Sequence, residues 1–467
     1  DHFLSENGLR MRTKFERTRS AVHHAPSPSE MRRSISANEH SVCGQTQSCL
    51  PDHFLSENGL RMRTKFERTA SADEGNPVTP TNLAKLYASA ILTPSATALG
   101  IADQKPSVNL SSMLIKAQSP SAAEALELVA KLQARFVEGL ERVSSACGQD
   151  AGFEESEWLR DTGQHGGGNR YTVSESDLFN RASVNVSQVH YDDLPEKKLG
   201  SATAISTIIH PQNPHAPSVH IHISWTEMKA AGNAPSKGYG GHGGYWRIMA
   251  DLNPSVLHEA YRDQFVQCMR QAAPSQYEEA AAQGDRYFYI PALGRHRGAT
   301  HFYLESYATE NVEADRAFAE LFGKRVIDSY LEILQSALAT YPDVDTAAKA
   351  EQLAYHTLYM FQVLTLDRGT TSGLLVHDQN DLGIMGSLPA RVAQELLDSW
   401  QSKVEPPQDE LVAQLVKALP DTSPAVVNDE VKLALARIVR EHYQKNPEAL
   451  AMQASGNVIA PTVDNHR

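Results

Sequence analysis

Cysteine is scarce in this chain, and the few that occur form no recognisable framework. Only Cys43, Cys49, Cys147 and Cys268 are present among 467 residues. That number is too small for a disulfide scaffold, and the CxxC spacing typical of zinc sites is missing. We therefore expect reduced thiols in a reducing compartment.

Long apolar runs and an excess of basic residues are missing as well. No segment approaches the roughly twenty apolar residues that span a bilayer, so we expect no membrane span. Lys and Arg number 43 against 56 Asp and Glu, which gives a formal net charge of −13. Proteins that hold phosphate backbones need clustered cations, so nucleic acid is not an expected partner.

The first part of the chain has little of the periodicity that packed elements need. Residues 1–18 recur unchanged at 52–69, but one perfect copy does not make a structural array. We predict a disordered leader (1–75), a linker (76–118), one folded domain (119–447) and a disordered tail (448–467). The leader is rich in Arg and Ser yet holds several acids, so we expect a cytoplasmic protein, with a mitochondrion or plastid as the alternative if the leader is a transit peptide.

Apolar spacing predicts an α+β fold. Ser121 is a predicted N-cap, and apolar residues recur at helical spacing from Leu126 to Val143. Strands are predicted at 170–173, 184–190, 201–209, 218–228, 244–250, 300–305 and 358–366, and further helices at about 255–283, 311–341 and 345–357 and after 389. The loop before the strand at 218–228 is too short for a helical crossover, which favours antiparallel pairing. We expect one large, mainly antiparallel sheet of about seven strands, flanked on both faces by helices.

Polar side chains alternate along one of these predicted strands. A period of two places His220, His222 and Ser224 on one face, away from the apolar residues between them. By the same period Arg247 and Asp251 share a face of the next strand, where a cation and a carboxylate could meet one ligand. This face is our candidate site.

Simpler interpretations of the same residues stay open. His220 and His222 fit a zinc or iron site, which needs a third protein ligand, or two structural histidines. Arg247 and Asp251 fit a structural salt bridge. The glycines at 166–168 could cradle an anion, although they lack the Lys and spacing of a P-loop.

Taken in order, several motifs resemble those of the oxygen-dependent coproporphyrinogen III oxidases. The resemblance runs from about Trp158 to Leu388. It comprises GGGNR (166–170), LFNRASVNVSQVH (178–190), STIIHPQNPHAP (206–217), ADLNP (250–254), DRYFYI (285–290), RHRG (295–298), LDRGTTSGL (366–374) and GSLP (386–389). The order and spacing of these motifs make the resemblance specific, and the chain is identified as a divergent member.

The resemblance implies an enzyme of porphyrin and haem biosynthesis. Members of this family convert two propionates of coproporphyrinogen III to vinyls, giving protoporphyrinogen IX, with dioxygen as co-substrate and carbon dioxide and hydrogen peroxide as by-products. No metal or organic cofactor is expected, because the electron-rich pyrroles act as the reductant. A homodimer is also implied, and apolar residues such as Leu397 and Leu415 fit either a subunit contact or the domain's own core.

The resemblance also implies roles for individual residues. His220 matches the family's general acid, and Asp251 matches the aspartate that engages the central pyrrole nitrogens, so these two are the predicted catalytic residues. The predicted substrate-binding residues are Ser206, His210, His222, Ser224, Arg247, Arg368 and Asn380.

The chain departs from the family pattern at cations that face the substrate. One family Arg is Ser224 here, and another aligns with Asn380. We predict that Arg247 takes over the carboxylate contact left vacant at Ser224. Two histidines linked to metal in the family align with Tyr261 and Ala292. These departures keep open a non-catalytic tetrapyrrole-binding homologue, and the HxH pair keeps open a metal-dependent oxygenase or hydrolase.

Overall fold

The computed structural model describes residues 114–229, 243–456 and 463. All of them belong to one of the two compact units into which the chain divides, residues 101–467. The predicted leader, most of the predicted linker and nearly all of the chain after 456 lie outside the described residues. Within the described part, no helix is both long and apolar enough to cross a membrane.

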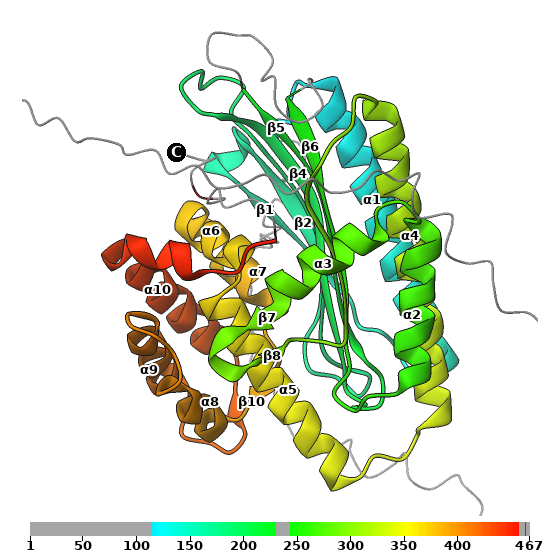
Figure 1. The fold of residues 1–467 in the computed structure, drawn as a ribbon, viewed down its shortest axis with the longest axis vertical. Helices are drawn as coiled ribbons and strands as arrows, with labels where there is room; N and C mark the ends of the chain where they lie inside the picture. The colour runs from blue at the N-terminus through cyan, green and yellow to red at the C-terminus, as the bar shows by residue number, and fades with distance from the viewer. Residues whose placement is uncertain (1–113, 230–242, 457–462, 464–467) are drawn as a thin grey trace, which may run out of the picture. The chain divides into compact units, whose positions relative to one another are not determined.

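A seven-stranded sheet lies at the centre of the described unit (Figure 1). Its spatial order is β1-β2-β3-β4-β5-β6-β9. The strands are β1 (Glu154–Leu159), β2 (Gly166–Val173), β3 (Phe179–His190), β4 (Leu199–Pro211), β5 (Ser218–Met228), β6 (Gly244–Asn253) and β9 (Thr300–Tyr307). Each strand pairs with its neighbours in antiparallel fashion, so the predicted α+β class is confirmed.

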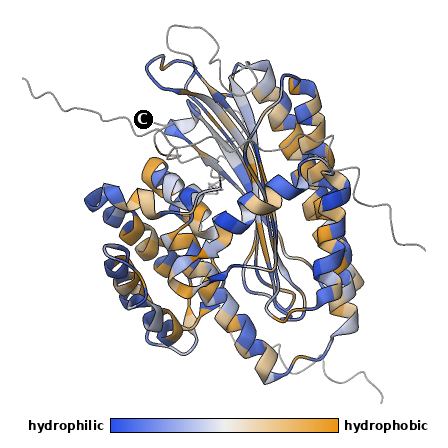
Figure 2. Ribbon diagram, in the orientation of Figure 1, coloured by the Kyte–Doolittle hydropathy of each residue, from blue (hydrophilic) through white to orange (hydrophobic). Residues whose placement is uncertain are grey.

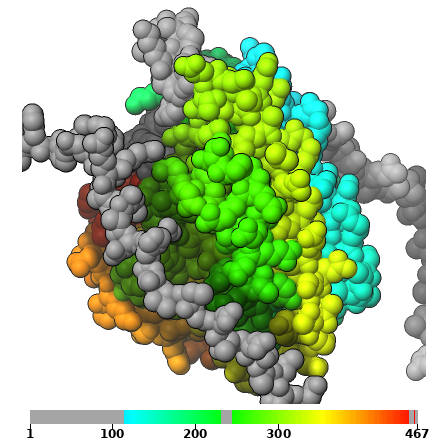
Figure 3. Space-filling model, turned by 45° about the vertical axis from the view of Figure 1, so that its right-hand side comes forward, coloured from blue at the N-terminus to red at the C-terminus, as the bar shows by residue number. Residues whose placement is uncertain are grey.

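Three long helices cover one face of the sheet: α1 (Pro120–Ala146), α2 (Glu259–Ala272) and α4 (Val312–Thr340) (Figure 1). Hydrophilic and hydrophobic residues mix along all three, as expected for amphipathic helices (Figure 2). On the surface, α4 runs between α1 and the green residues of α2 (Figure 3). Buried residues such as Leu132 and Phe322 join the strands in one core.

The helices that follow α4 in the chain lie on the other side of the sheet (Figure 1). They are α5 (Thr346–Thr365), α6 (Arg368–Val376), α7 (Asp381–Ile384), α8 (Gln394–Gln401), α9 (Gln408–Ala418) and α10 (Asp429–Lys445), with the short hairpin β10 (Arg391–Val392) and β11 (Ala425–Val426). Leu397 and Leu415 are buried among them, so they close the domain's own core. Helix α3 (Tyr277–Phe288) packs along the edge strand β9 and leads into a hairpin of β7 (Tyr289–Ile290) and β8 (Arg295–His296).

The alternation predicted for β5 is confirmed. Val219, Ile221 and Ile223 have no exposed surface and join the core beneath α1 and α4. His220 and His222 point to the opposite face, toward α5 and α6. Because successive side chains of a strand leave on opposite faces, the apolar half of β5 anchors the sheet and the polar half is free to line a site.

Three local predictions were wrong. The segment 358–366, predicted as a strand, lies almost entirely inside α5. Every residue from Tyr355 to Thr365 is buried, so this run has no polar face to reveal a helical period. The predicted helix at 255–283 is two helices, interrupted near Pro274. Helix α1 is capped by Ser119, whose Oγ accepts a hydrogen bond from the Ala122 amide, instead of by Ser121.

Three further features differ from expectation: strand β1, the glycine triplet and the residues after 447. Strand β1 was not predicted, because its sequence EESEWL is charged and mostly exposed. The glycine triplet belongs to β2, where Gly166 has φ +92° and a Cβ would lie 2.1 Å from the Gln188 carbonyl oxygen. Close strand packing thus explains it without an anion. Residues 447–452, expected to open the disordered tail, form a 3-10 helix with Ala449 buried.

Candidate active site

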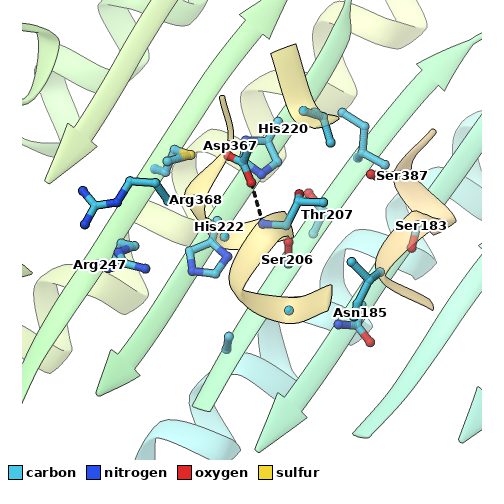
Figure 4. Close-up of a pocket in the computed structure, with 18 of the residues that line it drawn as sticks. Ser183, Asn185, Ser206, Thr207, His220, His222, Arg247, Asp367, Arg368 and Ser387 are labelled. Carbon is cyan, nitrogen blue, oxygen red and sulfur yellow. Dashed lines mark hydrogen bonds between the residues drawn. The ribbon is translucent and has the colours of Figure 1, made fainter. Parts of the chain in front are cut away.

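A cavity of about 250 Å³ lies between the polar face of the sheet and the helices α3, α5 and α6 (Figure 4). Strands β3 to β6 and β9 contribute Ser183, Asn185, Ser187, Ser206, Thr207, His220, His222, Arg247, Met249, Tyr303 and Glu305. The helices and turns contribute Tyr287, Arg297, Tyr359, Asp367, Arg368 and Ser387. Polar residues from distant parts of the chain therefore converge on one concave surface, which is the usual form of a small-molecule site.

The register of β5 and β6 fixes the order of the key side chains. His220 lies opposite Asp251, His222 opposite Met249 and Ser224 opposite Arg247. Directly opposed side chains in an antiparallel pair are close neighbours. Arg247 is therefore placed beside Ser224, the position at which the resemblance implies an arginine.

Three arginines line the cavity, and two of them are already paired. Arg297 contacts Asp251 at 2.7 Å, and Arg368 contacts Glu305 at 2.9 Å. Among the described residues Arg247 makes no ion pair, and its Nε donates to the Glu305 carbonyl oxygen at 3.4 Å. Arg247 is thus the lining cation best able to receive a carboxylate from a ligand.

The imidazole of His222 next to this arginine is uncharged. Burial, together with the nearby Arg247 and His220, lowers the pKa of His222 to about 3. Its Nε2 lies 3.1 Å from the Ser224 hydroxyl. At neutral pH His222 can therefore give or accept a hydrogen bond but adds no charge to the cavity.

His220 is held by a buried carboxylate. Its Nδ1 donates to Asp251 Oδ1 at 2.8 Å, and its side chain is 18% exposed. This hydrogen bond fixes the ring and leaves Nε2 as the nitrogen available to a ligand. The histidine is therefore built to exchange a proton with a molecule in the cavity.

Three donors converge on Asp251. Besides His220, the Asn253 side-chain amide and the Arg297 guanidinium each reach Oδ2 at 2.7 Å. Burial would raise the pKa of this carboxyl, but Arg297 and the hydrogen bonds from His220 and Asn253 outweigh burial and hold the pKa below its usual range. Asp251 is thus a permanent anion beneath the cavity.

The structure does not place Asp251 where the sequence suggested. The carboxylate has no exposed surface and is not among the residues that line the cavity. Three protein donors hold its two oxygens and the carboxylate is buried, so this arrangement does not offer direct contact with pyrrole nitrogens. Asp251 acts on the cavity through His220 and Arg297, which do line it.

The other predicted residues divide into two groups. Ser206, His220, His222, Arg247 and Arg368 line the cavity. His210, Ser224 and Asn380 do not: His210 is fully buried with its ring 4.7 Å from that of Tyr359, Ser224 bonds to His222, and Asn380 accepts a hydrogen bond from Arg170.

Sequence reasoning missed Arg297 and the pair of Tyr287 and Asp367. Arg297 lies in RHRG, a motif we noted for its resemblance and gave no role. The Tyr287 hydroxyl donates to Asp367 Oδ1 at 2.8 Å across the cavity wall. Burial raises the pKa of Tyr287, so its hydroxyl stays protonated as a donor. Tyr287 lies in DRYFYI and Asp367 in LDRGTTSGL, but no local pattern joins the two motifs, because they are far apart in sequence.

Within the described residues the HxH pair gains no third metal ligand. His220 is engaged by Asp251 and His222 by Ser224. Across the described residues, no group of three or more His, Cys, Asp or Glu side chains could hold a metal ion.

Comparison with known proteins agrees with this site. The family model for coproporphyrinogen III oxidase matches residues 124–421. The chain is 27% identical over 298 residues to an oxygen-dependent coproporphyrinogen-III oxidase from Drosophila melanogaster, covering 60% of this chain and 73% of that protein. It is 29% identical over 274 residues to a protein of the same name from Rickettsia bellii, covering 56% and 91%. A mitochondrial enzyme of that name from Rattus norvegicus is 26% identical over 318 residues, covering 63% and 68%. The matched segment holds every residue of the cavity, and we conclude that this chain belongs to the coproporphyrinogen III oxidase family.

Proposed function

We propose that this protein is an oxygen-dependent coproporphyrinogen III oxidase. It converts two propionate side chains of coproporphyrinogen III to vinyl groups, giving protoporphyrinogen IX for haem synthesis. For each propionate, the substrate and one dioxygen take up a proton and yield a vinyl group, carbon dioxide and hydrogen peroxide. Two electrons pass from the substrate to dioxygen in each step, so the balance needs no other reductant.

Arg247 carries the proposal, because it is a lining cation without an ion pair among the described residues. A propionate carboxylate would accept charge-assisted hydrogen bonds from its guanidinium. Arg297 and Arg368 also line the cavity, but each is paired with a carboxylate. Ser206 and neutral His222 would add uncharged hydrogen bonds around the same ligand.

His220 would be the proton-transfer residue. Its Nε2 faces the cavity while Nδ1 is held by Asp251. As an electron pair leaves the porphyrinogen, a proton must leave the carbon that becomes part of the vinyl group or the pyrrole that stabilises the charge, and a held imidazole can accept it. Asp251 would be a positioning residue that fixes the ring and stabilises the imidazolium, as a buried aspartate does for a catalytic histidine.

The substrate itself would supply the reducing power, and we propose that no metal or organic cofactor takes part. Four electron-rich pyrroles make the deprotonated porphyrinogen a reductant for dioxygen. The protein's task is then to hold and orient the macrocycle and to move protons. The HxH pair fits a reaction without a metal, because Asp251 engages His220 and Ser224 engages His222.

Compartment and assembly are part of the proposal. Cys147 and Cys268 are free thiols, which fits the cytoplasm that we propose, and the rat relative's mitochondrial name keeps that organelle as the alternative. We also propose a homodimer. Light scattering of the full chain would measure its mass in solution.

The test compares aerobic and anaerobic incubation of the full chain with coproporphyrinogen III. Protoporphyrinogen and peroxide should form together in air, with one peroxide molecule for each vinyl group formed. Neither product should form without dioxygen. His220→Ala should lower the rate of formation of both products by about 10²- to 10⁴-fold, while Arg262→Ala, a surface change on α2, should leave both rates unchanged. Tight binding of the substrate without turnover in air would instead favour the non-catalytic homologue.

A further inference from the structure

A second cavity, of about 550 Å³, lies beside the start of α10. It shares no lining residue with the first cavity. Its charged and polar lining includes Glu175, Arg181, Asn428, Asp429, Glu430 and Lys432. Nothing in the proposed reaction uses these groups, so their arrangement needs a separate explanation.

Arg181 forms the inner wall of this cavity. It lies on β3, is 8% exposed, and its Nε donates to the Leu388 carbonyl oxygen at 3.3 Å. In the stretches 114–229 and 243–456 its side chain makes no other hydrogen bond and no ion pair, so the terminal nitrogens have no protein acceptor there. These nitrogens keep some surface open to the cavity, where a carboxylate or an equivalent acceptor can reach them.

Lys432 is a second buried cation in the same wall. It is 5% exposed, and its Nζ contacts Asp429 Oδ1 at 2.9 Å. Burial and the nearby Arg181 both lower the pKa of Lys432, and burial lowers the pKa of Arg181. Two buried cations therefore repel one another across this cavity, and an anion between them would relieve the repulsion.

The acidic residues of the cavity lie farther out. The Asp429 side chain is 70% exposed and is taken by Lys432. Glu175 is 32% exposed and is held by Arg391 through two hydrogen bonds of 2.8 and 3.0 Å. Glu175 and Asp429 thus stand at the mouth with partners of their own and Glu430 is exposed, while Arg181 lies inside without an ion pair among the described residues.

The N-terminus of α10, with Asp429 and Glu430 in its first turn, also lies at this cavity. This helix has 17 residues and begins after Asn428, whose side chain accepts from the Val431 amide. The first amides of a helix carry partial positive charge and favour anions. Two buried cations and a helix N-terminus therefore face one cavity.

We propose that the cavity between Arg181 and Lys432 binds a small tetrahedral oxyanion of the phosphate class. The planar fork of Arg181 can take two oxygens of one anion, and Lys432 supplies a point charge to a third. The exposed carboxylates at the mouth would repel large polyanions, which favours a small ion over a nucleotide or a nucleic acid.

Calorimetric titration of the full chain with inorganic phosphate, at constant ionic strength in chloride, tests this site. Saturable binding of one phosphate per chain is expected. Because a hydrogen bond to a charged group contributes about 1.5–3 kcal/mol, Arg181→Gln and Lys432→Gln should each weaken the affinity by about tenfold or more. Lys324→Gln, which removes an exposed lysine of α4, is the matched control and should change nothing.

Four results would overturn the proposal. These are no saturable heat with the unaltered chain, a phosphate affinity in both cavity variants that is unchanged from that of the unaltered chain, loss of binding in Arg247→Gln instead, and competition by acetate as strong as that by sulfate. Circular dichroism melts accompany each variant. If Arg181→Gln unfolds, the phosphate affinity of Lys432→Gln alone tests the proposal. This variant is expected to fold, because the exposed carboxylate of Asp429 remains hydrated when its partner Lys432 is replaced.

Discussion

Replacing Asp251 with asparagine separates two roles that this carboxylate could have. The substitution keeps the shape of the side chain but removes its charge, so the buried Arg297 loses its carboxylate partner at 2.7 Å. Breaking one side of a buried ion pair costs about 3–5 kcal/mol. Most domains have about 5–15 kcal/mol of stability, so we expect a folded but weakened protein in urea unfolding.

The kinetic result is the decisive one. If Asp251 only holds His220, Asp251→Asn should lower kcat by about 10²- to 10⁴-fold, the usual range for general acid–base catalysis, and leave KM for coproporphyrinogen III within about threefold. If the carboxylate instead binds the pyrrole nitrogens, KM should rise and kcat should change less.

A double substitution sharpens this test. Because Asp251 acts through His220, adding Asp251→Asn to His220→Ala should cause no further loss of kcat. Fully multiplicative losses in kcat would show that the two residues act independently, and the positioning role would then be refuted. Activity is measured without urea, at a temperature at which circular dichroism shows that both variants are folded.

Three further outcomes follow from the site. Arg247→Ala should raise KM for coproporphyrinogen III about tenfold or more, with a smaller change in kcat. Arg247→Lys should recover part of this loss of affinity. An unchanged KM for Arg247→Ala would contradict the carboxylate contact. His222→Gln should leave the shape of the pH–rate profile between pH 5 and 9 unchanged, because a pKa of about 3 keeps this ring neutral there; the loss of a limb would show that His222 titrates. The pKa of Asp251 in the folded protein lies below its value in the unfolded chain, so the contribution of this carboxylate to the free energy of unfolding should be complete above about pH 5 and decline as the pH falls below about 4. The urea midpoint measured as a function of pH tests this. In Asp251→Asn the midpoint should fall less on acidification than in the unaltered chain.

Much of the fold could be predicted from local patterns. The alternation in β5 identified both its buried face and its polar face, because the strand lies between an apolar core and a cavity. The same reasoning failed for residues 358–366, where α5 is buried on all sides and offers no contrast between faces. It also failed for β1, whose exposed acidic residues carry no apolar signal.

The site could be predicted only in part, because its geometry depends on register and on distant contacts. Period and motif order indicated that His220, His222 and Arg247 share one surface, which the β5 and β6 pairing explains. The burial of Asp251 could not be predicted, since Arg297 reaches it from a turn 46 positions along the chain. His210 was expected in the cavity because of its motif, yet Tyr359 of α5 packs on its ring.

The acidic character of β1 has a consequence for behaviour at high concentration. This strand is the outermost of the sheet in the described part of the chain, and it pairs only with β2 there. An outermost strand can recruit a strand from another molecule and start aggregation. The exposed Glu154, Glu155 and Glu157 place a row of negative charge along that border, so two copies approaching border to border would repel each other, and β1 protects the protein from fibrous self-association.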